Sequence, residues 1–208
     1  MRCLLALSAL VCSVAAAESL PVASVTVVLS GDGASSSVLL AMERETDSTL
    51  APSGLKLNWV NTQSLPGSGI DGELSVLRLR GNCSLTVPGR TTDLPVAANG
   101  NAILGQTHIT DGRVLPIADV LCDAVRKVVD RDLKAAPARD REELLGRALG
   151  RVAAHELYHM LVHTTEHARS GLSRPEQSSS ELLARHESFS PEDERRISDS
   201  LEPDASGR

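Results

Sequence analysis

The chain has 208 residues, of which 41% are hydrophobic, and its 27 acidic residues outnumber its 21 basic ones, for a net charge of −6 at pH 7. This length suits one domain with a core of its own. No basic patch with interleaved aromatic residues occurs, which argues against nucleic acid as a partner. The core is expected to be aliphatic, because the aromatic residues are limited to Trp59, Tyr158 and Phe189.

The first 17 residues have the features of a secretory signal peptide. Arg2 gives a positive start, residues 4–14 form an apolar run, and three alanines at positions 15–17 offer a cleavage site. The apolar run is too short to span a bilayer, and no later segment is long and apolar enough to do so. We therefore expect a secreted or periplasmic protein without stable membrane insertion.

Residues 18–201 are then expected to form the mature domain, and residues 202–208 a disordered tail. The cysteines of this part are Cys83 and Cys122. Two cysteines in an exported chain predict one disulfide, closing a loop of about 40 residues. Two buried free thiols are the alternative. The oligomeric state is left open by the sequence.

The N-terminal half begins with a strand and a helix. Residues 24–30 (SVTVVLS) are β-branched and apolar and predict a buried strand. A helical period of apolar residues over 36–50 predicts a helix, and alternation over 55–60 predicts a half-buried strand. This order favours a sheet with a crossover helix. Residues 61–73 are expected to form a surface loop, and residues 74–80 a third strand.

The C-terminal half is predicted to be mainly helical. Residues 102–109 are expected to form a further strand. Pro116 fits the start of a helix, and the apolar stripe after it predicts this helix over residues 118–129. The longest helix is predicted over residues 139–162. Two short helices are predicted after it, over residues 180–185 and 191–201. Strands and helices together place the chain in the α+β class.

Four of the six histidines lie between positions 155 and 167, which indicates a metal site. His155 and His159 are four residues apart, so on a helix they present two imidazoles to one cation. Neutral imidazole binds Zn²⁺ at about 2.0–2.1 Å. Glu156 is placed to accept a proton from a zinc-bound water, whose pKa zinc lowers to about 7. These residues predict a site that activates water.

His155 and His159 supply two ligands, and the predicted zinc site needs a third. His163 lies about 12 Å from His155 along a continuous helix, so it could join only if the helix ends first. His167 follows a short polar stretch suited to a turn, and we expect it to be the third ligand beside one open position. Glu166 and Glu181 are the remaining alternatives.

The stretch LGRVAAHELYHMLVHTTEHARSGL resembles the active-site helix and following turn of the metzincin clan of zinc metallopeptidases. Within that clan it is most similar to small secreted bacterial proteins near the matrixin and adamalysin group. The resemblance implies that His155, His159 and His167 bind one zinc ion and that Glu156 is the general base. AILGQTH occupies the place of the edge strand that binds substrate in this clan.

The resemblance also implies a fold and an activity. The expected fold is zincin-like, with a twisted mixed sheet, a backing helix and a central active-site helix. The implied activity is that of a zinc metalloendopeptidase acting on a peptide or protein substrate. By themselves, the residues predict only water activated by a metal ion.

Three departures from the clan pattern are visible. His167 lies eight residues after His159, where the clan has six, and Val162 stands at the position of the turn glycine. No methionine follows Met160, and Ser173 takes the place of the clan's methionine turn. These departures keep an alternative open: a secreted zinc-binding or interaction protein with a degenerate site that does not turn over. A structural metal site is a third interpretation.

Other polar residues have less specific roles. Tyr158 is expected to pack rather than to catalyse, because it points away from the face that carries the two histidines. Asp119 and Asp123 are candidates for orienting a ligand imidazole. His108 and His186 are expected at the surface.

Overall fold

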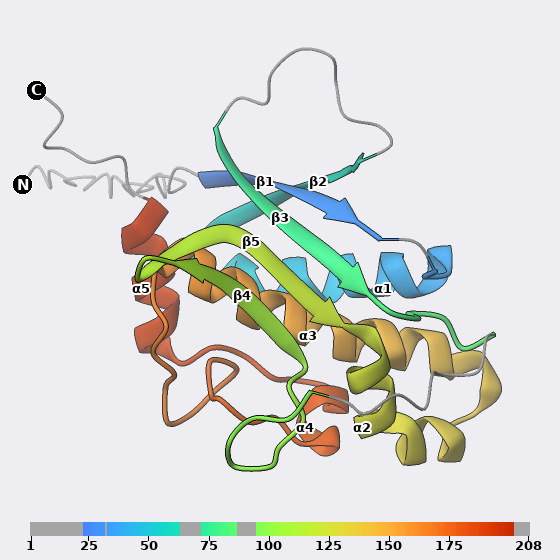
Figure 1. The fold of residues 1–208 in the computed structure, drawn as a ribbon. Coiled ribbons are helices and arrows are strands. Elements are labelled where there is room, and N and C mark those ends of the chain that lie inside the picture. The colour runs from blue at the N-terminus through green and yellow to red at the C-terminus, as the bar shows by residue number, and fades with distance from the viewer. Residues whose placement is uncertain (1–22, 32, 63–71, 87–94, 202–208) are drawn as a thin grey trace, which may run out of the picture.

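A computed structural model describes residues 23–31, 33–62, 72–86 and 95–201 (Figure 1). In this part of the chain, a five-stranded sheet has the strand order β2-β1-β3-β5-β4. The α+β class predicted from the sequence is confirmed. The predicted signal peptide at residues 1–17 and the tail at residues 202–208 lie outside the described residues.

The first crossover forms as predicted. β1 (Ala23–Ser30) leads into α1 (Ser36–Leu50), and β2 (Leu55–Asn61) returns to pair with β1 in parallel. The side chain of Ser35 caps α1 by accepting a hydrogen bond from the backbone N–H of Val38. The five central residues of β1 are buried, as expected for a strand inside a parallel sheet.

The remaining strands complete a mixed sheet. β3 (Glu73–Arg80) pairs in parallel with both β1 and β5 (Arg113–Leu121). β4 (Gly105–Thr110) pairs antiparallel with β5 and forms one edge of the sheet. Asp111 and Gly112, both with positive φ, make the tight turn between them.

The helix predicted over residues 118–129 is wrong in its first part, since residues 113–121 form β5 and α2 (Cys122–Ala135) begins only at Cys122. Ala118 and Val120 are fully buried and the intervening Asp119 is not, which is the alternation of a strand. Pro116 is tolerated because it precedes the residues that pair with β3 and lies at the register shift against β4. There its missing N–H breaks no regular ladder.

α3 (Arg141–Val162) crosses beneath the sheet beside α1, and a 3₁₀ turn (Ala138–Asp140) precedes it (Figure 1). The two helices approach closely at Gly146, where a Cβ atom would lie 2.4 Å from the Cβ of Ala41. Nearly every residue of α3 from Leu145 onward is buried. The helix that carries the histidines is therefore the centre of the core.

Two short helices follow α3, close to the predicted ranges. They are α4 (Ser179–Leu183) and α5 (Pro191–Leu201). α5 lies near the carboxyl end of α3, at the left of Figure 1. Within the described ranges, no helix combines the length and the apolar character needed to cross a membrane.

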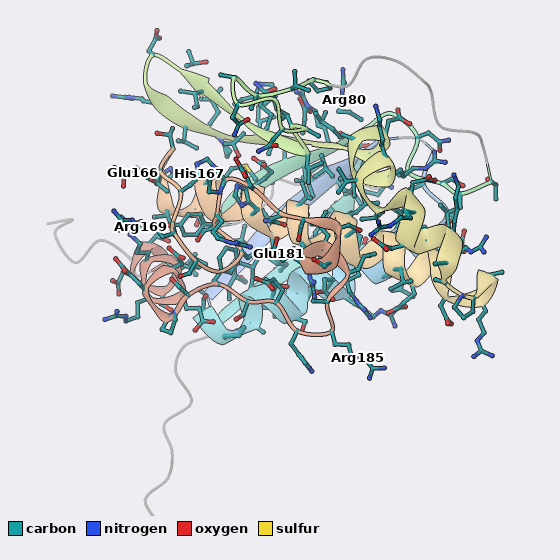
Figure 2. The ribbon with its side chains drawn as sticks, turned by 90° about the horizontal axis from the view of Figure 1, so that it is seen from below. Arg80, Glu166, His167, Arg169, Glu181 and Arg185 are labelled. Carbon is teal, nitrogen blue, oxygen red and sulfur yellow. A yellow bond between two sulfur atoms is a disulfide. The ribbon has the colours of Figure 1, made fainter. Side chains whose placement is uncertain are left out.

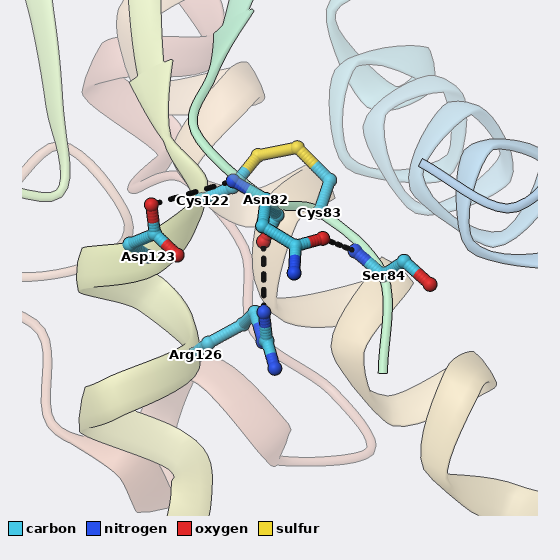
Figure 3. Close-up of a disulfide and its surroundings, with 6 residues drawn as sticks. All are labelled: Asn82, Cys83, Ser84, Cys122, Asp123 and Arg126. Atoms are coloured by element: carbon cyan, nitrogen blue, oxygen red, sulfur yellow. Dashed lines mark hydrogen bonds between the residues drawn. A yellow bond between two sulfur atoms is a disulfide. The ribbon is translucent and has the colours of Figure 1, made fainter. Parts of the chain in front are cut away.

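The predicted disulfide joins Cys83 and Cys122 and is confirmed (Figure 3). It connects the segment after β3 to the first residue of α2. Beside it, the backbone N–H of Asn82 donates to Asp123, and Arg126 donates to the carbonyl of Asn82 (Figure 3). This corner fixes the start of α2 against the sheet.

Candidate metal centre

Three histidines meet at the carboxyl end of α3. His155 and His159 are buried on the helix, and the exposed His167 approaches them from the segment that follows. One ring nitrogen from each lies within 4.8 Å of the others. The Nε2 atoms of His155 and His159 are 3.1 Å apart. In the described part of the chain, these are the His, Cys, Asp and Glu side chains grouped closely enough to hold a metal ion.

The helix ends at His163, and this end brings His167 back. His163 has φ 51°, in the left-handed region, and its N–H donates to the carbonyl of His159. The N–H of Thr164 also donates to that carbonyl. Val162 is the last helical residue, so the turn begins at His163. The exposed His163 is used as the helix cap and does not belong to the histidine group.

Backbone carbonyls orient the two buried rings. Nδ1 of His155 donates to the carbonyl oxygen of Leu172, and Nδ1 of His159 donates to that of Thr164, both at 2.8 Å. A carbonyl can only accept, so each Nδ1 carries the proton and each Nε2 keeps a lone pair. This is the tautomer that binds a metal ion through Nε2.

The aspartates predicted to orient the imidazoles do not do so. Asp119 accepts two hydrogen bonds from Arg78 and lies 3.0 Å from Nε2 of His108, and Asp123 accepts from Asn82. His108 is thus a partly exposed member of an ion-pair cluster. Backbone carbonyls have no residue type of their own, so the sequence carried no signal for the groups that orient the histidines.

The histidines are held neutral. Burial lowers the pKa of His155 to about 3, with a further contribution from the nearby His159. Burial also lowers the pKa values of His159 and His167. Near pH 7 all three rings are therefore free of the extra proton that would compete with a cation.

Glu156 is buried against the edge strand. The hydroxyl of Thr107 on β4 donates to its Oε2 at 2.6 Å. A Cβ atom on Gly105 would lie 2.5 Å from its Oε1, so the missing side chain leaves room for the carboxylate. Burial raises the pKa of Glu156 to about 7, although the hydrogen bond from Thr107 opposes this.

Sequence reasoning missed the contributions of Gly105 and Thr107. A glycine inside a predicted strand does indicate a close approach by another group. The sequence pattern, however, could not identify the group that approaches Gly105, because this depends on how β4 packs over α3.

A cavity of about 710 Å³ opens beside the histidines. Its walls come from β4 and the segment before it, from α3, and from residues 164–167 and 174–181. Asn99 donates a hydrogen bond of 2.6 Å to Glu176, joining the segment before β4 to the opposite wall. The three histidines and Glu156 all face this cavity.

The two glutamates considered as third ligands have other partners. Glu181 caps the amino end of α4 through Ser178 and pairs with Arg174. Its hydrogen bonds from Ser178, followed by that from Arg174, lower its pKa to about 2. Glu166 is exposed and lies 3.9 Å from Arg196. Figure 2 shows Glu181 well apart from His167, whose neighbour Glu166 lies beside it.

Comparison of the chain with protein-family models, with curated proteins and with solved structures gives no match. What the site can do is therefore judged from its own residues.

Proposed function

We propose that the chain is an exported zinc-dependent peptidase of metzincin-like build, with zinc held by His155, His159 and His167. The observation that carries this proposal is the pair of Nε2 atoms 3.1 Å apart. Both Nδ1 atoms are committed to carbonyls, so two lone pairs face one another, which is unfavourable unless a cation lies between them.

The spacing fits the geometry of zinc. Tetrahedral ligands at about 2.0–2.1 Å from the metal lie roughly 3.3–3.4 Å from one another. The pair on α3 is already near this value. His167 closes the group within 4.8 Å and is the exposed member, so its ring has the freedom to move inward. Three imidazoles with one open position make a catalytic rather than a closed structural donor set.

The arrangement around the histidines supports a zincin-like fold within the α+β class. β4 is the antiparallel edge of an otherwise parallel sheet, and it borders the cavity next to α3. β4 pairs with β5 and with no further described strand. Its other side can therefore accept an extended peptide by adding a strand. This favours a peptide or protein as the substrate.

Each residue has a role in this scheme. Bound zinc would supply a Lewis acid that polarises the scissile carbonyl and lowers the pKa of water. Glu156 accepts the proton of the attacking water and passes it to the leaving amine. A base with a pKa of about 7 can do both near neutral pH. Thr107 holds the carboxylate in place through its hydroxyl.

One observation favours the second candidate, a secreted zinc-binding protein without turnover. Glu156 is hydrogen-bonded to Thr107 of the edge strand, and its raised pKa leaves much of it protonated at pH 7. If zinc binding does not release this carboxylate, the site holds an ion and lacks a base.

The decisive experiment measures zinc content and peptidase activity together. Purified wild-type protein is compared with Glu156→Gln, His167→Ala and the control His163→Asn, each assayed on a peptide library after zinc loading. Asparagine removes the imidazole and tolerates the left-handed backbone at the end of α3. We expect one zinc per chain in all but His167→Ala, and hydrolysis only by wild type and His163→Asn.

Each other outcome has a clear meaning. Zinc retained in full by His167→Ala would remove that residue from the site. Zinc bound by a wild-type protein that hydrolyses nothing would favour the second candidate. A wild-type protein that takes up no zinc would rule out both the peptidase and the zinc-binding protein.

A further inference from the structure

α5 contacts the residues that support the three histidines through one buried carboxylate. Asp193 lies in the first turn of α5 and is only 2% exposed. It accepts hydrogen bonds from the hydroxyls of Ser173 at 2.5 Å, Ser190 at 2.7 Å and Tyr158 at 3.0 Å. Ser190 belongs to the segment before α5, whereas Ser173 and Tyr158 belong to segments that support the histidines.

Ser173 links Asp193 to two of the three histidines. The preceding carbonyl, that of Leu172, accepts the Nδ1 proton of His155. The carbonyl of Ser173 itself accepts the N–H of Ala168, the residue after His167. One short turn therefore supports His155 directly and fixes the backbone next to His167.

That turn lies directly against the segment before α5. The N–H of Leu172 donates to the carbonyl of Ser188. Gly171 has φ 73°, and a Cβ atom on it would lie 2.9 Å from the backbone nitrogen of Ser190. The turn thus depends on residues 188–193 for its position.

Tyr158 links the same carboxylate to the third histidine. Its ring packs edge-on against His159, with 5.6 Å between centroids. Its hydroxyl donates to Asp193 and accepts a hydrogen bond from Arg196, one turn later on α5. Arg196 also lies 3.9 Å from Glu166, the neighbour of His167.

We propose that Asp193 is a positioning residue for the metal centre, through which α5 holds all three histidines in their binding geometry. The proposal rests on the metal site proposed above. Asp193 touches neither the metal position nor the cavity lining, and it acts through the turn of residues 171–173 and through Tyr158. No residue type in the His155 to His167 stretch indicates this dependence on a helix about 30 residues later.

The carboxylate suits this role because it can only accept. Burial raises the pKa of Asp193, but the hydrogen bonds from Ser173, Ser190 and Tyr158 outweigh this effect and hold the pKa below its ordinary value. An ionised carboxylate can take all three hydroxyl donors at once. An amide in its place keeps one accepting oxygen, but its NH2 group replaces the other oxygen and faces at least one hydroxyl that now donates.

The test compares Asp193→Asn with a matched control, Asp199→Asn, which makes the same change at an exposed position of α5. A third variant, Ser173→Ala, removes only the hydroxyl between Asp193 and the turn. Two quantities are measured in the full chain. One is zinc affinity by competition with a chelator, and the other is the tautomer of each histidine in the metal-free protein by ¹⁵N NMR.

We expect Asp193→Asn to lose about tenfold to a hundredfold in zinc affinity, the usual effect of removing a group that orients a ligand. In the metal-free variant, His155 should lose its single Nδ1–H tautomer. Ser173→Ala should show the same changes to a smaller degree, and Asp199→Asn should match wild type.

Unchanged affinity and unchanged tautomers in a folded Asp193→Asn protein would overturn the proposal. If that variant does not fold, Ser173→Ala decides in the same way, because it removes one hydroxyl and leaves the carboxylate. If wild type binds no zinc, the proposed function fails, yet the tautomer of His155 still tests the role of Asp193.

Discussion

The carbonyl oxygens of Leu172 and Thr164 decide which nitrogen of each buried histidine is free. Each takes one Nδ1 proton, and both Nε2 atoms are left facing the same point. At the scale of single residues, two lone pairs are therefore available to the cation that we propose. The position of Glu156 likewise depends on two single residues of β4, Gly105 and Thr107.

Thr107 is expected to matter for turnover and not for zinc binding. Replacing it with valine keeps the shape but removes the hydroxyl that donates to Glu156. We expect the kcat for peptide hydrolysis to fall about tenfold to a hundredfold. This is less than the roughly hundredfold to ten-thousandfold that a positioned base contributes, because Glu156 itself remains. KM and zinc content should change little, and steady-state kinetics with zinc analysis measure all three.

Two further variants serve as controls for Thr107. Thr107→Ser keeps the hydroxyl and should recover most of kcat, and Thr110→Val makes the same change at an exposed position of β4. Loss of zinc from Thr107→Val would instead give this residue a role in the metal site.

Burial of Glu156 should make the stability of the metal-free protein depend on pH. Its pKa is about 7 when folded, against 4.5 for the ordinary group. The free-energy cost of burying the ionised carboxylate is therefore absent below pH 4.5, grows as the pH rises, and is complete above pH 7. Glu156→Gln should be more stable than wild type at pH 8 by up to about 3 kcal/mol. The two should converge near pH 4.

Urea unfolding in the presence of a chelator measures this difference. The comparison between the two proteins cancels the opposing effect of the buried histidines, whose lowered pKa values weaken the fold as the pH falls below 6.5. A difference that does not change with pH would mean that Glu156 is not held in a raised-pKa environment.

Much of the site could be predicted at this scale from spacing alone. His155 and His159 are four residues apart on a helix, so their pairing follows from helix geometry. The approach of His167 required the helix to end, and His163 ends it without a glycine. Gly105, Thr107 and Asp193 could not be predicted, because their contacts arise from elements distant in sequence.

At the scale of elements, α3 is placed by its packing against α1. Gly146 allows the two helix backbones to approach, with the Cβ of Ala41 filling the space that a side chain would need. The sequence predicted both helices correctly from their periods. It placed the start of α2 too early, because the alternation of residues 113–121 was hidden by Pro116 and by the apolar stripe that follows.

Gly146→Ala should destabilise the protein, although alanine favours a helix by about 1 kcal/mol. Its Cβ would lie 2.4 Å from the Cβ of Ala41 and 2.7 Å from the carbonyl of Val38, so the helices must separate. We expect a loss of about 1–3 kcal/mol in the free energy of unfolding. Urea denaturation measures it.

A second change tests the cause. Ala41→Gly in the Gly146→Ala background removes one of the two colliding groups and should recover part of the loss. A stability gain from Gly146→Ala alone would show that α1 and α3 do not pack as closely as described.

At the scale of the whole molecule, the centre joins segments that are far apart in the chain. β4 and α3 line it, the turn of residues 171–173 orients His155, and α5 supports that turn. The unfolded chain has no such arrangement, so an ion that binds here stabilises the native state by mass action.

Zinc should therefore raise the melting temperature of the metal-free protein. At a hundredfold excess over Kd, the gain is about 2.7 kcal/mol, or roughly 5–11 °C for a chain of this size. Because the pKa values of the three histidines are lowered, the rise should persist from pH 8 down to about pH 6. Calorimetry at several pH values measures it. His167→Ala should lose most of the effect.

The exposure of His167 has a consequence for the kinetics of metal exchange. Two of the proposed ligands are buried on a rigid helix, whereas His167 lies at the surface on an irregular segment. An ion would therefore leave by detaching first from His167, and an external chelator would enter by the same side. The residence time of the ion should follow the mobility of residues 164–167, so a change that stiffens this segment would slow exchange in both directions and leave the affinity nearly unchanged.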